Sequence, residues 1–130
     1  IRNYAEVCAR EPMLINLNDA KAKGIATGDV VRVFNDMGEI LVGALVAIIP
    51  KHVIAICEGA WYDPEVLGEK SLCEHGCVNV PTRNKDISDT TQSNCGHGVL
   101  ANLEKFKGEI KLVATFSKQK FAIFVEFIEI

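Results

Sequence analysis

Residues 26–50 read ATGDVVRVFNDMGEILVGALVAIIP, and this stretch decides the fold. Two runs rich in aliphatic and β-branched residues, 29–34 (DVVRVF) and 39–46 (EILVGALV), flank the four residues from Asn35 to Gly38. Asn, Asp and Gly between two such runs are typical of a β-hairpin. The stretch therefore predicts two antiparallel strands joined by a tight turn.

A short helix is predicted just before this hairpin, over residues 16–25 (NLNDAKAKGI). Asn18 can cap its first turn, and Asp19 stands where a negative charge favours the helix start. Gly24 offers the left-handed residue with which many helices end. We expect a helix too short to be stable without packing against strands.

Further strands are predicted at residues 52–57, 99–106, 109–116 and 121–130, each a short apolar run. A chain of short strands with one or two small helices indicates a mainly β fold. A closed six-stranded barrel is favoured over a sandwich, because closure removes exposed strand edges.

Composition limits the classes of function. The 130 residues are 48% hydrophobic and 24% charged, which is typical of one globular domain spanning residues 1–130. No apolar run approaches the roughly 20 residues that cross a bilayer, so membrane insertion is not expected. The net charge of -3 and scattered basic residues argue against nucleic acid as a partner. The first residue is not Met and no signal peptide is visible, so we expect a fragment of a longer protein.

Residues 58–98 form a long irregular stretch that contains most of the candidate binding groups. Amide and hydroxyl side chains both donate and accept hydrogen bonds, which suits the edge of a heterocycle such as a pterin or guanine. Such residues also simply build turns, and composition alone leaves both interpretations open. The candidates in this stretch are Asn79, Thr82, Gln92, Ser93, Asn94 and His97.

Two short clusters, CEHGC (73–77) and CGH (95–97), offer a competing zinc site of thiols and imidazoles. Their spacing is looser than strong zinc signatures, and five cysteines in irregular positions are also compatible with reduced, buried thiols. The alternative function is therefore a stand-alone small β-barrel that binds zinc or a protein partner. Trp61 could stack on a cofactor, or it could be an ordinary core or lid residue. No nucleophile, base and orienting group stand in a recognisable order, which indicates a binding domain without its own catalytic centre.

Four stretches, 10–40, 58–64 (EGAWYDP), 72–83 (LCEHGCVNVPTR) and 91–108, together resemble one family. They are similar to the C-terminal molybdopterin-dinucleotide-binding domain of the dimethyl sulfoxide reductase superfamily, in the branch of trimethylamine N-oxide and biotin sulfoxide reductases. The resemblance covers about residues 2–118. It implies a double-psi β-barrel and a bis(molybdopterin guanine dinucleotide) molybdenum cofactor held mainly by upstream domains of the same enzyme.

The resemblance also implies a parent oxidoreductase that reduces trimethylamine N-oxide or a related small N- or S-oxide in anaerobic respiration. The isolated chain should be inactive, because the molybdenum ligand of this branch lies upstream; no metal ligand and no catalytic residue is assigned within it. Relatives that reduce trimethylamine N-oxide are periplasmic and the biotin sulfoxide branch is cytoplasmic, so we expect the periplasm, with the cytoplasm as the alternative.

Site residues follow from the same resemblance. Asn79 matches the pterin-contacting asparagine of the family. Gln92, Asn94 and His97 match its second cofactor-facing segment, with Ser93 and Thr82 as further candidates; Trp61 matches a position near the substrate funnel. The sequence departs from the family at Pro81 and over residues 84–91. The tail, residues 119–130, extends past relatives, and its alternating apolar pattern suits an added edge strand or a partner surface.

Overall fold

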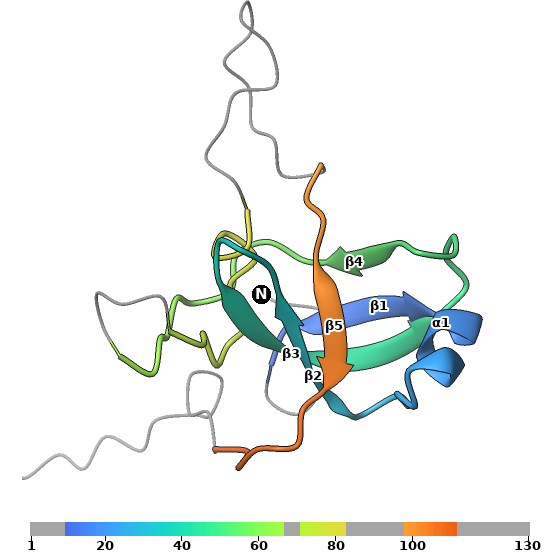
Figure 1. Ribbon diagram of the computed structural model, residues 1–130, viewed down its shortest axis with the longest axis horizontal. Helices are drawn as coiled ribbons and strands as arrows, with labels where there is room; N and C mark the ends of the chain where they lie inside the picture. Colours follow the sequence, from blue (N-terminus) through green and yellow to red (C-terminus); the bar gives the residue numbers. More distant parts are fainter. Residues whose placement is uncertain (1–9, 67–70, 83–97, 112–130) are drawn as a thin grey trace, which may run out of the picture.

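The computed structural model describes residues 10–66, 71–82 and 98–111 (Figure 1). This part of the chain is mainly β, with one short helix. In chain order the elements are β1 (Pro12–Asn16), α1 (Leu17–Ala22), β2 (Val30–Phe34), β3 (Glu39–Ala47), β4 (Ile54–Ile56) and β5 (Asn102–Lys105). Among the described residues, no helix has the length and apolar character that a bilayer crossing needs.

The predicted hairpin is confirmed as β2 and β3, which pair antiparallel from Val30 opposite Gly43 to Phe34 opposite Glu39. The turn closes with a 3.0 Å hydrogen bond from the backbone nitrogen of Asn35 to the backbone carbonyl oxygen of Gly38. Alternating aliphatic residues of both strands face the core, which is why this stretch of sequence determines the centre of the sheet.

Strand β1 was not expected from the sequence. It lies parallel to β3, with Pro12 opposite Gly43 and Asn16 opposite Ala47, and β4 pairs antiparallel with its other edge. A five-residue run that begins with proline and leads directly into a helix carries little strand signal. The pairing is decided by β3, about 30 residues along the chain, which a local pattern does not reveal.

Helix α1 lies in the predicted place, but its capping residue is Asn16 and not Asn18. The Asn16 side chain accepts a 2.8 Å hydrogen bond from the backbone nitrogen of Asn18. Asn16 ends β1 with extended backbone, so a single residue terminates the strand and caps the helix. Gly24 has φ +65°, which confirms the predicted left-handed exit.

The strands form one mixed sheet of five, in the order β4-β1-β3-β2-β5. Within the described residues β4 and β5 are unpaired edges, so the six-stranded closed barrel is not seen there. Residues 109–111 are not in a strand, while the rest of the strand predicted at 109–116 and all of 121–130 lie outside the described residues. The sheet is strongly twisted, with β5 running steeply across the direction of β1 and β3 (Figure 1). One groove of about 470 Å³ is lined by residues of both edge strands, β4 and β5, and by residues next to them in sequence.

One apolar core holds the sheet together, and β3 crosses its centre. Ile40 to Ala44 are buried in succession, which indicates that both faces of this strand are covered. Ile40, Val42 and Ala44 belong to the core cluster, and Leu41, which is also buried, donates its backbone N–H to the carbonyl oxygen of Cys73. The core cluster comprises Met13, Ile15, Ala20, Ile25, Val31, Val33, Ile40, Val42, Ala44, Cys73 and Cys77.

Candidate functional site

The segment CEHGC (residues 73–77) is fixed along an edge of β3, where Cys73 forms a parallel bridge with Ile40. Cys73 donates its backbone N–H to the carbonyl oxygen of Glu39 (3.0 Å) and accepts from the N–H of Leu41 (2.9 Å). Gly76 then approaches the strand so closely, with φ +78°, that a side chain would not fit there without displacement. The segment is thus placed on the sheet by backbone contacts.

The neighbouring WYDP segment (residues 61–64) is bound to CEHGC in turn. The N–H of Glu74 donates to the carbonyl oxygen of Asp63 (2.9 Å), and the N–H of Asp63 lies 3.4 Å from Sγ of Cys73. Nδ1 of the buried His75 lies 3.0 Å from a carboxylate oxygen of Asp63. The two motifs, separated in sequence, therefore form one unit on the sheet.

A tight turn follows CEHGC and presents Asn79. The N–H of Val80 donates to Cys77 (3.0 Å), and that of Thr82 donates to Asn79 (3.3 Å). The hydroxyl of Thr82 donates to the carbonyl oxygen of Val78 (2.8 Å). Asn79 itself is exposed at the tip of this turn, so its amide is accessible to a ligand.

Beside this turn lies a depression of about 370 Å³, named here the Asn79 hollow. Pockets of about 300–1,000 Å³ are typical of small-molecule sites. The hollow brings together three parts of the chain: the β2–β3 turn, the WYDP segment and the Asn79 turn. Its lining residues are Met37, Gly38, Tyr62, Ser71, Cys77, Asn79 and Val80.

The predicted site residues fall into three groups. Asn79 lines the hollow. Trp61 is 64% exposed but does not line it, and Thr82 uses its hydroxyl to close the turn. Gln92, Ser93, Asn94 and His97 lie outside the described residues. Three lining residues, Met37, Tyr62 and Ser71, were not predicted from the sequence. Tyr62 adjoins the predicted Trp61, whereas Met37 gave no signal beyond its place in the hairpin turn.

The competing zinc site is not assembled by the described residues. Within residues 10–66, 71–82 and 98–111, no three His, Cys, Asp or Glu side chains gather as metal ligands. Cys73 and Cys77 are buried, and burial raises the pKa of the Cys77 thiol, which opposes the thiolate that a metal would need. Cys95 and His97 lie outside the described residues.

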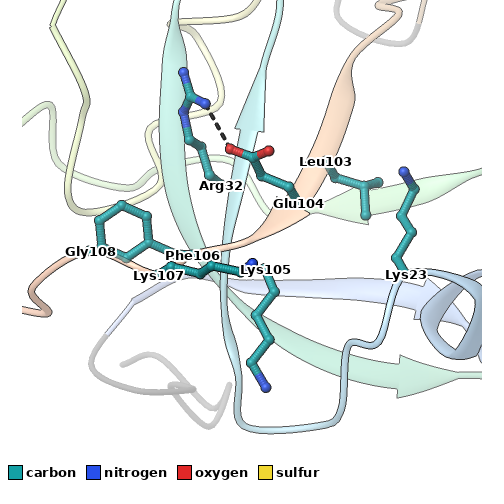
Figure 2. A pocket seen from close by; sticks show the side chains of 8 residues that line it. All are labelled: Lys23, Arg32, Leu103, Glu104, Lys105, Phe106, Lys107 and Gly108. Atoms are coloured by element: carbon teal, nitrogen blue, oxygen red, sulfur yellow. Dashed lines mark hydrogen bonds and ion pairs between the residues drawn. The ribbon is translucent and has the colours of Figure 1, made fainter.

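A second depression, of about 590 Å³, lies along β5 and is rich in cationic side chains (Figure 2). Arg32 is engaged by Glu104 on β5 (2.8 Å) and by Glu39 on β3, and these carboxylates raise its pKa, Glu104 most strongly. Lys105 pairs with Asp29 (2.8 Å). In Figure 2 the Lys105 side chain points away from Arg32, and Lys23 stands apart from both. These cations do not converge on one point as an anion site requires.

The chemistry of the Asn79 hollow suits an uncharged, polar heterocycle. An exposed primary amide, a half-exposed phenol and turn backbone face a partly apolar wall that includes Met37 and Val80. Such a set can hydrogen-bond to a ligand edge on which donors and acceptors alternate and can pack against a ring face, as a pterin or guanine would require. The residues present therefore fit a pterin-type ligand better than a metal ion or a free phosphate.

Comparison with known proteins assigns the chain to a family. The model of the molydopterin dinucleotide binding domain matches residues 2–100. The chain is 46% identical to a dimethyl sulfoxide/trimethylamine N-oxide reductase of Cereibacter sphaeroides and 42% identical to a trimethylamine-N-oxide reductase of Haemophilus influenzae. Each alignment covers 92% of the present chain. The chain is 43% identical to trimethylamine-N-oxide reductase 1 of Escherichia coli K12 over 87% of its length.

The chain spans only about 15% of the length of these relatives, 14% in the last case. The resemblance noted in the sequence is thus confirmed, and it concerns a small part of much larger proteins. The chain belongs to the molydopterin dinucleotide binding domain family.

Proposed function

We propose that this chain is the C-terminal cofactor-binding domain of a larger molybdenum oxotransferase that reduces trimethylamine N-oxide or a related N- or S-oxide. The observation that carries the proposal is the Asn79 hollow, where residues from three separate motifs surround an exposed amide. The names of the relatives, which are N-oxide and S-oxide reductases, support the substrate class.

In this proposal Asn79 holds the polar edge of a pterin by donating and accepting through its amide, and Tyr62 covers part of the ring. Thr82, Gln92, Ser93, Asn94, His97 and Trp61 are the further proposed contacts. When bound, the molybdenum of bis(molybdopterin guanine dinucleotide) supplies the oxygen-atom transfer and two-electron chemistry. This chain contributes recognition and exclusion of water, and the remaining domains of the parent contribute the rest of the cofactor site.

Three further features belong to the same proposal. The five-stranded sheet becomes part of a six-stranded double-psi barrel, since both of its edges already line a common groove. The upstream domains of the parent are its partner. The parent acts in the periplasm, with the cytoplasm as the alternative.

The test replaces Asn79 with alanine in the full-length parent, and molybdenum per chain is measured during dialysis. Loss of one hydrogen-bonding amide should speed molybdenum loss roughly five- to tenfold. Asn102→Ala is the matched control, because Asn102 is an exposed asparagine on β5 that does not line the Asn79 hollow. Gln92→Ala tests the second proposed contact. Unchanged molybdenum retention in the Asn79 variant would refute the site.

A further inference from the structure

The side chain of Asn35, in the β2–β3 turn, connects three parts of the chain through four hydrogen bonds. Its oxygen accepts from the backbone nitrogens of Met37 (2.9 Å) and Gly38 (3.3 Å). Its nitrogen donates to the carbonyl oxygens of Pro81 (2.8 Å) and Leu100 (3.2 Å). A primary amide has two N–H donors and two acceptor lone pairs, so the full capacity of this side chain is used.

These four bonds act at the border of the Asn79 hollow. Met37 and Gly38 form its wall on the hairpin side, and Val80, next to Pro81, forms the facing wall. The two walls touch: a Cβ on Gly38 would lie 2.6 Å from Cγ1 of Val80. The Asn35 amide therefore joins the two walls at the point where they meet.

We propose that Asn35 is a positioning residue, which holds the Asn79 turn against the β2–β3 hairpin and thereby sets the shape of the Asn79 hollow. This inference rests on the proposed function for its ligand, but the positioning itself is a property of the described residues. Asn35 does not line the hollow and acts only through its neighbours.

The hairpin alone does not require asparagine at this position. Aspartate accepts hydrogen bonds from the following turn amides equally well and is as common as asparagine in such turns. Only the two N–H groups, directed at Pro81 and Leu100, distinguish the amide from a carboxylate. A carboxylate would instead face two carbonyl oxygens without a proton between them, which is unfavourable for a half-buried group.

The substitution Asn35→Asp, which keeps the side-chain shape, is therefore the decisive variant. Amide hydrogen exchange of the chain is measured at neutral pH, with Asn102→Asp as a control that adds the same charge at an exposed position. We expect the amides of Val80 and Thr82 to exchange roughly tenfold faster in Asn35→Asp, while amides of β1 and β3 keep their rates. The control should leave both groups unchanged.

The same variant in the full-length parent tests the consequence for the ligand. Molybdenum should be lost roughly tenfold faster than from the unsubstituted parent, although Asn35 is not itself a lining residue of the hollow. Equal acceleration of exchange in β1, β3 and the Asn79 turn would overturn the proposal, because Asn35 would then stabilise only the whole fold. Unchanged exchange at Val80 and Thr82 would overturn it as well.

Failure of the proposed function gives a different pattern. If Asn79→Ala retains molybdenum normally while Asn35→Asp loosens only the Asn79 turn, the cofactor assignment is refuted and the positioning role of Asn35 is upheld.

Discussion

Replacing Gly76 with alanine tests how tightly CEHGC is fixed to the sheet. Gly76 has φ +78°, in the left-handed region that alanine enters at a cost of about 1–2 kcal/mol. A Cβ there would lie 3.0 Å from the carbonyl oxygen of Leu41, 3.0 Å from Cγ1 of Val42 and 3.3 Å from Cβ of Glu11. Because two of these three atoms belong to backbone or to a short branched side chain, the site has little freedom to relax.

Overpacking of this kind costs about 1–3 kcal/mol, so Gly76→Ala should lower the free energy of unfolding by about 2–5 kcal/mol in all. Gly24→Ala is the matched control. Gly24 also has a positive φ, +65°, but a Cβ there meets nothing within 4 Å. This control should cost only the backbone part, about 1–2 kcal/mol.

The two variants are compared by urea unfolding of the chain, followed by far-ultraviolet circular dichroism and by the fluorescence of Trp61, the single tryptophan. The difference between them isolates the steric contact with β3. If Gly76→Ala costs no more than Gly24→Ala, the close approach of CEHGC to β3 is refuted, and with it the account of how the Asn79 turn is placed.

Three other outcomes are expected. Lys105, more than any other group, lowers the pKa of Asp29 below its ordinary value of about 3.9. The ionised Asp29 therefore stabilises the fold fully above that pH, and this stabilisation is lost as the pH falls through the lowered pKa. Asp29→Asn should flatten the decline in unfolding free energy below about pH 4. Iodoacetamide mapped by mass spectrometry should modify the exposed Cys57 well before Cys77, whose thiol is buried and whose pKa is raised by that burial; equal rates would contradict this. Ile40→Ala should cost about 2–5 kcal/mol in urea unfolding, since Ile40 is fully buried in the core; a cost below 1 kcal/mol would contradict its central position.

The hairpin was predictable because its signals are local. The turn residues Asn35 to Gly38 and the apolar runs on either side are sufficient to place β2 and β3 to within about a residue. Strand β1 was not predictable in this way, since its five residues form a strand only through partners far along the chain. The strands predicted at 52–57 and 99–106 exist but are shorter, because pairing ends before the apolar pattern does.

The candidate site was predictable to a smaller extent. Asn79 was recognised by residue type and family resemblance, and the structure places it beside a hollow. The roles of Asn35 and Gly76 were not foreseen, because each depends on a contact between segments distant in sequence. For the same reason, the buried position of His75 beside Asp63 did not follow from the motif CEHGC alone.

The placement of β1 between β3 and β4 has a consequence for how quickly the native state is reached. Pro12 meets Gly43, and Val31 meets Lys105, so much of the sheet joins residues that are remote in sequence. Topologies of this kind have high contact order, and such domains commonly need milliseconds to seconds to fold. The β2–β3 hairpin is the only strand pair here that closes over a short loop, within the part of the chain that the structure describes. Refolding should therefore begin at this hairpin, and the capture of β1 along its edge should limit the rate.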